Sequence, residues 1–388
     1  MDYDVIIVGA RAAGAATAML MARSGLRVLV VDRASRGTDT LSTHAVMRTG
    51  VLQLHRWGLL NEVIDAGTPP VRRTIVHYGD EAVPVDFRPG AGIDALYAPR
   101  RTVLDPILVA AAEEAGAEFR FGVGVTDLTR DATGRVIGVK GRDESGRHFD
   151  ARSQLTVGAD GVRSLVARKT GARLSRAGSG STALVYGYWS DVDIEGYEWF
   201  FRPGMSGGLI PTNHGEICVW IGTPAATFKT GLLSGGEGTI DRVFSRLHAS
   251  TAAKLRRGRH GVLRGFPGIP GFFRQAWGPG WALVGDSGYF KDPISAHGIS
   301  DALRDAEFLA RAAVEVLAGD VPEHVALTAY QETRDRLSAR LFTATDRVAT
   351  YQWDLRELFD LLLETSAAMR DEFNELAALN EPLSTAAA

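Results

Sequence analysis

The sequence predicts an α/β fold that contains an inserted β-sheet domain and ends in a helical C-terminal tail. Three observations lead to this prediction. The chain opens with a buried strand, a glycine-rich turn, a helix and a second buried strand. Short aromatic segments separated by turns occupy residues 180–270, and helical sequence follows from residue 300. Because α/β sequence lies on both sides of the aromatic segments, the second domain is inserted into the first.

Length and composition exclude several classes of protein. The chain has 388 residues, more than one domain usually holds, which predicts two domains. It is 45% hydrophobic and 23% charged with a net charge of −3, so it lacks the basic excess of a nucleic-acid binder. The 44 glycines follow no collagen period. Cys218 is the one cysteine, which excludes an internal disulfide and a cysteine zinc site. We therefore expect a cytoplasmic protein without a metal.

The first unit is a strand, a helix and a strand. These elements are expected at residues 4–9 (DVIIVG), 12–24 and 26–32 (LRVLVVD). Such a unit makes the two strands parallel neighbours. The apolar residues 5–22 are interrupted by Arg11 and preceded by Asp2 and Asp4. This pattern predicts neither a membrane span nor a secretory signal.

The remaining elements follow in chain order. We expect a hairpin at 71–97, a helix at 104–115, a strand at 119–128, two strands within 136–150, a strand at 155–158, mostly strands at 180–270, a strand at 281–284, a helix at 300–317 and helices at 323–380. The first domain is then predicted at residues 1–70, 98–180 and 275–320, the inserted domain at 71–97 and 181–274, and the tail at 321–388.

The turn after the first strand carries a glycine motif. It consists of Gly9, Ala10, Arg11, Ala12, Ala13 and Gly14. The motif matches the dinucleotide pattern GxGxxG at its first and third glycines, which make the tight turn and let the helix pack on the sheet. Arg11 replaces the second glycine and offers positive charge beside the helix N-terminus. Asp32 ends the second strand, where it can accept ribose hydroxyls. The sequence therefore predicts a Rossmann-like domain.

Two further motifs place an aspartate beside a glycine at the end of a buried strand. Residues 158–164 (GADGVRS) contain Asp160, and residues 285–299 (GDSGYFKDPISAHGI) contain Asp286. Ligands of open α/β sheets bind at the carboxyl ends of the strands. Either aspartate alone could be a helix N-cap, but the order and separation of the three motifs indicate a bound dinucleotide.

Together the three motifs resemble those of class A flavoprotein monooxygenases, the para-hydroxybenzoate hydroxylase superfamily. The resemblance covers residues 1–320. It implies that the first motif binds the pyrophosphate of FAD, that Asp160 and Gly161 serve FAD and NAD(P)H, and that Asp286 holds the ribityl chain. Arg101, in the segment RTVL, resembles the family's arginine at the flavin phosphate. Val125 resembles the family's valine at the adenine.

The resemblance, together with the positions of the motifs, predicts the FAD contacts. They are Gly9, Ala10, Arg11, Ala12, Ala13, Gly14, Asp32, Arg33, His44, Arg101, Val125, Asp160, Gly161, Gly285, Asp286, Pro293, His297, Gly298 and Ile299. Two of these residues have open alternatives. His44 either bonds the flavin or deprotonates a phenol, or is a structural histidine. His297 stands where the family has a small residue, and either touches flavin or substrate or packs at a helix start.

The resemblance implies an FAD-dependent monooxygenase. NAD(P)H would reduce the flavin transiently, and a flavin C4a-hydroperoxide formed with O2 would hydroxylate a small, aromatic substrate. Tyr186, Tyr188, Trp199, Phe201 and Trp220 lie on expected strands of the insertion and are candidates for an apolar substrate site. No side chain is singled out as a catalytic acid or base, and the oligomeric state is open.

Three alternatives remain from the sequence. Residues 197–201 (YEWFF) partly resemble the YxWxF-type motif of geranylgeranyl reductases, which keeps an FAD-dependent reductase acting on an apolar, isoprenoid substrate. The same residues match the WxWxIP motif of flavin-dependent halogenases less well. A flavin-binding carrier without turnover is the third alternative. The basic residues 254–259 either attract an NADPH phosphate or form a solvated helix end.

Overall fold

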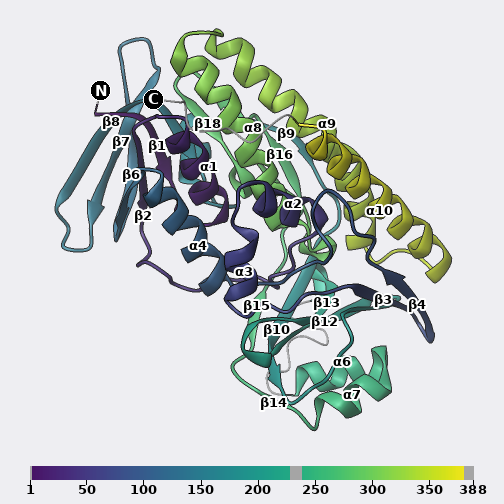
Figure 1. Cartoon of the computed structure of the whole chain (residues 1–388). Coiled ribbons are helices and arrows are strands. Elements are labelled where there is room, and N and C mark those ends of the chain that lie inside the picture. Colours follow the sequence, from purple (N-terminus) through teal and green to yellow (C-terminus); the bar gives the residue numbers. More distant parts are fainter. Residues whose placement is uncertain (1, 228–237, 380–388) are drawn as a thin grey trace.

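The computed structural model describes residues 2–227 and 238–379, so the last nine residues of the predicted tail lie outside the described residues. The α/β fold with its second sheet and helical C-terminal region is confirmed (Figure 1). The chain passes from the first sheet to the second and back more than once, because β3, β4 and β10–β15 belong to the second sheet. This path agrees with an insertion.

The first sheet contains the predicted strand–helix–strand unit. Its strands are β1 (Tyr3–Val8), β2 (Val28–Asp32), β5 (Glu118–Phe121), β6 (Val123–Arg130), β7 (Val136–Asp143), β8 (His148–Gly158), β17 (Trp277–Gly278) and β18 (Trp281–Leu283). The order β17-β18-β8-β1-β2-β5 places β1 between two parallel neighbours. Its central strands are buried, and α1 (Ala12–Arg23) and α4 (Arg101–Glu114) pack together beside them.

Two boundaries in this sheet differ from the prediction. The single strand expected at 119–128 is broken at Gly122, whose positive φ of 71° ends β5 and starts β6 in a new direction. The separate strand expected at 155–158 is the end of β8, which first pairs antiparallel with β7 and then parallel with β1. The first half of β8 is polar and its end is buried, and this change in pattern predicted two strands where there is one.

The second sheet has a helical layer on one face. Its strands are β3 (Arg73–Tyr78), β4 (Glu81–Asp86), β10 (Thr182–Ser190), β11 (Tyr197–Arg202), β12 (Met205–Pro211), β13 (Ile217–Pro224), β14 (Arg259–His260) and β15 (Arg264–Phe266). The mostly β prediction missed α6 (Thr239–Leu247) and α7 (Ala249–Leu255). Buried residues of α6 recur at helical spacing and cover the sheet, and Figure 1 shows both helices at the end far from α1.

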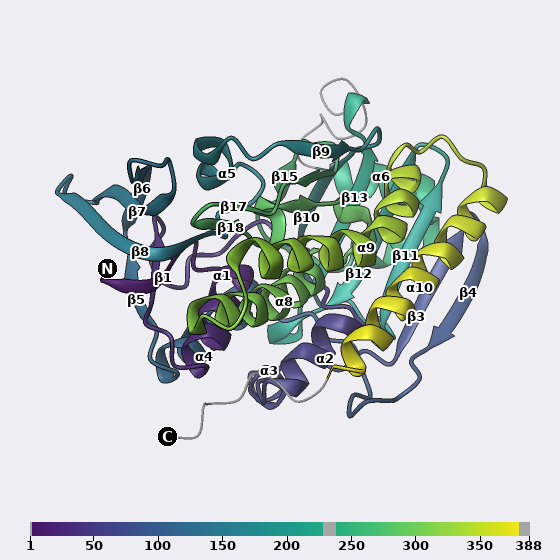
Figure 2. The same cartoon turned by 90° about the horizontal axis from the view of Figure 1, so that it is seen from above.

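The remaining elements form a third sheet and the helical parts of the first domain and tail. They are β9 (Leu174–Ala177), β16 (Phe272–Arg274), β19 (Tyr289–Phe290), α2 (Arg48–Arg56), α3 (Leu60–Asp65), α5 (Leu165–Thr170), α8 (Gly298–Ala318), α9 (Glu323–Ala349) and α10 (Leu355–Ala377). Figure 2 shows α10 running obliquely between α2 and α9 and across β3 and β11. In the described ranges, no helix has both the length and the apolar character to cross a membrane.

Candidate cofactor site and substrate face

The three glycine motifs meet at the carboxyl edge of the first sheet. Val8 at the end of β1 lies opposite Val31 on β2 and Gly158 on β8, and Leu283 on β18 lies opposite Gly158. The three motifs, which follow β1, β8 and β18, are therefore neighbours in space, although each is more than 120 residues from the next in sequence. This is the edge at which a ligand of an open α/β sheet binds.

The first motif brings backbone close to backbone. Gly9 has a φ of 109°, and a Cβ on Gly14 would overlap the carbonyl oxygen of Gly9. Arg11 is the residue before α1, so the amides of the first helical turn lie directly beyond it. Asp32 accepts hydrogen bonds from the amides of Ala10, at 2.7 Å, and Ala34, at 2.8 Å. Each carboxylate oxygen keeps a second lone pair for a ribose hydroxyl, which stays a prediction.

A small hollow that is open to solvent lies beside this motif. Its lining includes Ala10, Arg11, Asp32, residues 34–38, Asp105, Pro106, Val109 and Phe121. The Nη1 atom of Arg11 is buried and has no hydrogen-bond partner among the described residues. Burial lowers the pKa of Arg11, and the nearby Arg101 adds to this effect. Two neighbouring guanidinium groups and a helix N-terminus fit a diphosphate.

The guanidinium of Arg101 is held by the carboxylate of Asp105, which lies one turn further along the same helix, α4. Its Nε and Nη2 atoms donate to Asp105 at 2.9 and 3.0 Å, and Asp105 is buried. Burial raises the pKa of Asp105, against the effect of Arg101 and Arg11. The predicted phosphate-side arginine is thus held in place. Arg33 is exposed with its Cβ near Gly124, and Val125 follows on β6, so these two predicted FAD contacts lie near each other.

The second and third motifs contact each other. The amide of Gly161 donates to the hydroxyl of Ser287 at 3.1 Å. Asp160 accepts from the hydroxyl of Ser164 and, at 2.6 Å, from the amide of Leu165. Asp160 therefore stabilises the start of α5, which is the N-cap-like role that the sequence left open. Its contact with FAD remains a prediction.

Asp286 lies in a mixed electrostatic environment at the end of β18. Burial, and then the charge of Asp301, raise its pKa to about 7 against the opposing effect of Lys291 and Arg101. Gly285 before it has a φ of 58°, and a Cβ there would lie 2.9 Å from that of Ala13 on α1. The third motif thus passes close to the first helix, with no room for a side chain at Gly285.

Residues 291–299, here called the flavin loop, follow this motif. Asp292 accepts from the amide of Thr182, at 2.6 Å, which ties the loop to β10. The loop includes Pro293 and leads through Gly298 and Ile299 into α8. The imidazole of His297 is fully buried, and its Nε2 atom lies 2.6 Å from Glu372 on α10. Packing at a helix start is therefore observed for His297, and a contact with flavin stays a prediction.

Alternate residues of β10 face opposite sides of the second sheet. Leu184, Tyr186 and Tyr188 belong to the core shared with the first domain, whereas Val185 and Trp189 pack with α6 and α7. The face toward the first domain, here called the substrate face, also carries Tyr197, Trp199, Ile210, Cys218 and Trp220. Tyr186 and Tyr188 thus lie on the same face of the second sheet, and this face is the inner one.

Phe201, a candidate substrate residue, lies where the second sheet meets the C-terminal helices. Its ring is packed in a cluster with Tyr351, Trp353 and Leu358, at the start of the C-terminal helices. Phe201 lies on the same side of β11 as Tyr197 and Trp199, at the end of the strand that meets this cluster, and Trp199 touches both groups. Phe201 therefore anchors the tail to the second sheet. The sequence could not show this, because its partners lie 150 residues later.

A polar group is embedded in the aromatic substrate face. His44, 1% exposed, has its Nε2 atom in a hydrogen bond with the hydroxyl of Tyr188, and its φ of 69° is unusual for a residue other than glycine. The guanidinium of Arg100 lies 3.4 Å from the ring centre of Tyr188 and is paired with Glu216 at 2.8 Å. Burial, then Arg100 and Arg101, lower the pKa of His44 to about 3, so its imidazole is neutral.

Several of the residues that contact Tyr186 and Tyr188 were not predicted from the sequence. The two consecutive arginines were the sequence feature that could have indicated Arg100. Arg100 lies over the ring of Tyr188, and Arg101 is paired with Asp105. The amide of Ser42 donates to the hydroxyl of Tyr186 at 3.1 Å, and Arg264 is paired with Asp39. The loop after β2 is thus bonded to the second sheet beside the candidate flavin site.

Comparison with known proteins agrees with this geometry. The FAD binding domain family matches residues 2–345. The chain belongs to this family. Its relatives are flavin-dependent enzymes, and the chain is an FAD-dependent oxidoreductase. The motifs fit FAD, since the glycine cradle has no room for a Cβ and Arg11 keeps an unpaired buried nitrogen.

Individual relatives include reductases and a monooxygenase. The chain is 25% identical over 379 residues to digeranylgeranylglycerophospholipid reductase 1 of Methanopyrus kandleri, which covers 93% of this chain and 94% of the relative. It is 28% identical to the menaquinone reductase of Mycolicibacterium smegmatis, covering 79% and 75%. PqsL of Pseudomonas aeruginosa, described as a probable FAD-dependent monooxygenase, has the same fold, with a TM-score of 0.78, 22% identity and 95% and 99% coverage.

Proposed function

We propose that this family member is an FAD-dependent reductase that adds hydrogen across a carbon–carbon double bond of an apolar, isoprenoid-type substrate. One observation carries the proposal: the similarity to a lipid reductase extends over 93% of the chain and therefore includes the substrate face. That face is lined by tyrosine, tryptophan and aliphatic side chains. An apolar wall with few polar groups is typical of a site for such a substrate.

The chain's own residues supply position and a proton. The glycine cradle, Arg11, Arg101 and Asp286 would hold FAD, which supplies hydride chemistry once it has been reduced by NAD(P)H. The substrate carbon that does not receive hydride needs a proton. Burial keeps the pKa of Tyr188 far above neutrality, so its hydroxyl is protonated, and Arg100 over the ring opposes the cost of the phenolate. We assign Tyr188 as the proton donor and His44 as its positioning residue.

Hydroxylation is the second candidate, and the fold shared with PqsL is the observation that favours it. A monooxygenase would use the same dry aromatic wall to exclude water from the reacting oxygen. Halogenation is supported less well, because residues 197–201 match the WxWxIP motif of flavin-dependent halogenases poorly. The two candidates differ in whether the substrate gains hydrogen or oxygen.

The decisive experiment is turnover with and without oxygen. The purified protein is given NADH or NADPH and a panel of isoprenoid lipids, quinones and phenols, and the products are analysed by mass spectrometry. We expect an isoprenoid product that has gained two hydrogens and forms equally under nitrogen. A product that gains oxygen and forms only in air would replace the reductase with the monooxygenase. Loss of FAD in Asp286→Ala checks the cofactor site separately.

A further inference from the structure

A cluster of buried charged side chains joins the flavin loop to the C-terminal helix. Its members are Lys291, His297, Asp301, Arg304, Asp305, Arg334 and Glu372, none of which is more than 5% exposed. Five come from the flavin loop and α8, one comes from α9, and Glu372 comes from α10. Burying so many charges costs free energy unless each is paired, so the partners in this cluster are specific.

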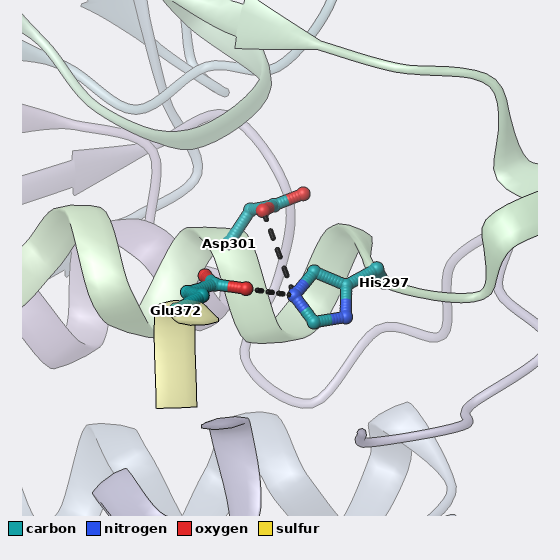
Figure 3. A group of neighbouring side chains, drawn as sticks. All are labelled: His297, Asp301 and Glu372. Carbon is teal, nitrogen blue, oxygen red and sulfur yellow. Dashed lines mark hydrogen bonds and ion pairs between the residues drawn. The ribbon is translucent and has the colours of Figure 1, made fainter. Parts of the chain in front are cut away.

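Glu372 is bonded through both of its carboxylate oxygens. Oε2 lies 2.6 Å from Nε2 of His297, and Oε1 accepts from Nη1 of Arg304 at 2.8 Å. Figure 3 shows His297 and Asp301 at the start of α8, with Glu372 reaching them from α10. Burial raises the pKa of Glu372, but His297 and Arg304 outweigh burial and hold that pKa well below its usual range. The carboxylate is therefore ionised.

The cluster contains three side chains that could in principle hold a metal ion. Ligand atoms of His297, Asp301 and Glu372 lie within 4.8 Å of one another. However, Lys291 is paired with Asp301, and Arg304 contacts Asp301 at 3.2 Å as well as Glu372. A divalent cation would face two fixed cations at the same carboxylates. The arrangement is that of an ion-pair network.

Four buried side-chain atoms of this network lack a hydrogen-bond partner among the described residues: Nδ1 of His297, Oδ1 of Asp301, Oδ2 of Asp305 and Nη1 of Arg334. Of these four atoms, Nδ1 of His297 is the one that lies in the flavin loop. Nδ1 of His297 is buried and finds no hydrogen-bond partner within residues 2–227 and 238–379. Buried polar atoms in native proteins are nearly always bonded, so this atom indicates a missing partner. His297 lies in the flavin loop, directly before α8 and five residues after Asp292. The network also reaches Asp286, whose pKa is affected by Asp301 and Lys291.

We propose that Glu372 is a positioning residue that holds His297 with Nδ1 directed at the bound flavin, so that the C-terminal helix completes the cofactor site. With Nε2 bonded to Glu372, Nδ1 is left to hydrogen-bond a polar atom of the flavin ring. The proposal rests on FAD binding at the flavin loop, as in the proposed function. It assigns a role to α10, which lies beyond residue 345, the end of the family match.

The end of α10 is anchored independently of Glu372. Nη1 of Arg56 on α2 donates to the carbonyl oxygens of Leu376, at 2.9 Å, and Leu379, at 3.1 Å. The buried Phe373 lies against the guanidinium of Arg48, 4.3 Å from the ring centre. Removing the charge of Glu372 therefore leaves the helix with other contacts to α2. This makes Glu372→Gln a usable variant.

The test compares FAD binding in Glu372→Gln and Glu375→Gln. Glu375 lies one turn further along α10, is partly exposed and pairs with Arg336, so it is a matched control. We expect the FAD dissociation constant, measured by the recovery of free FAD fluorescence, to rise at least tenfold in Glu372→Gln, with a shifted visible spectrum of the residual bound flavin. The control should match wild type. His297→Gln should reproduce the loss, and the double variant should be no weaker than either single variant.

Two outcomes would overturn the proposal. One is a Glu372→Gln protein that unfolds at lower temperature but binds FAD with wild-type affinity and spectrum, since Glu372 would then be a structural residue only. The other is normal FAD binding in His297→Gln, which also decides the matter if Glu372→Gln does not fold. A wild-type protein that binds no FAD would instead refute the cofactor site of the proposed function together with this inference.

Discussion

His44 is a neutral, buried histidine, and its burial makes the stability of the protein depend on pH. Its pKa is about 3 in the folded protein, because of burial first and then Arg100 and Arg101. A histidine in an unfolded chain has a pKa near 6.5. Between these two values the unfolded chain binds a proton that the folded protein does not bind. The contribution is therefore present above about pH 6.5 and is lost as the pH falls toward 3.

His44→Gln isolates this effect, since a glutamine amide can still bond the hydroxyl of Tyr188. Wild type should lose about 2 kcal/mol of unfolding free energy from this group between pH 7 and pH 5, and the variant should not. Urea unfolding at both pH values measures the difference. The stability advantage of wild type is expected to shrink on acidification. Parallel stability profiles would show that His44 is not the group that titrates.

The hydroxyl of Tyr188 is the polar group that the proposed reduction needs. Tyr188→Phe keeps the ring under Arg100 but removes the proton and the bond to His44. We expect the variant to retain FAD and to reduce substrate about 100-fold more slowly, as is usual when a general acid is removed. Tyr78→Phe, on β3 and packed against Phe359, is the control. Wild-type turnover in Tyr188→Phe would remove it from the mechanism.

At the level of elements, the turn between β1 and α1 depends on the absence of side chains. Gly14→Ala would place a methyl group on the carbonyl oxygen of Gly9, which cannot move without shifting the strand. We expect a loss of about 1–3 kcal/mol in stability, as for other overpacked sites, together with loss of bound FAD. Thermal unfolding and the visible absorbance of the flavin measure the two effects.

Gly261→Ala is the matched control for this prediction. Gly261 follows β14, and a Cβ there would meet nothing within 4 Å. The control should therefore retain both stability and FAD. If Gly14→Ala were also unaffected, the helix would have room to move away from the strand, and the close approach in the first motif would not be a requirement of the site.

Sequence patterns were sufficient where an element is defined by its own residues. The strand–helix–strand unit, the hairpin of β3 and β4 and the helix α8 each carry their signal locally, as buried runs, turn residues or helical periodicity. The motifs at Gly9, Asp160 and Asp286 were found for the same reason, and parallel pairing then brings them to one edge. The boundaries of β5, β6 and β8 depend on pairing and were not predicted.

Contacts between distant segments could not be predicted in this way. Glu372 looks like any acidic residue of an amphipathic helix, and only the fold brings it to His297, 75 residues earlier. The contact of Arg100 with Tyr188 was not predicted, because the resemblance concerns Arg101 alone. Phe201 was a candidate for the substrate site, and its packing against Tyr351 and Trp353 could not be predicted because these partners come from the tail. Each of these depends on how whole elements pack.

At the level of the whole molecule, the C-terminal helices connect the two sheets. Tyr351 donates to or accepts from Ser206 on β12 at 2.7 Å, while Tyr330 on α9 donates to the carbonyl oxygen of Leu283 on β18 at 2.8 Å. Glu372 reaches the flavin loop between them. The tail thus bonds to the first sheet, the second sheet and the loop that faces both, which determines how the substrate face sits over the cofactor edge.

Asp346 on α9 makes this connection at the point where the chain leaves the first domain. Its carboxylate accepts from the amides of Ser179, at 2.8 Å, and Gly180, at 2.9 Å, in the segment between β9 and β10. Asp346→Ala removes these charged acceptors and should lower the unfolding free energy by ~2 kcal/mol. Cleavage near residue 179 by a protease should also become faster. Asp371→Ala, which breaks only an exposed pair with Arg340, should change stability by less than about 0.5 kcal/mol. Equal, small effects in the two variants would mean that the packing of Phe201 and Trp353 holds the second sheet without this bond.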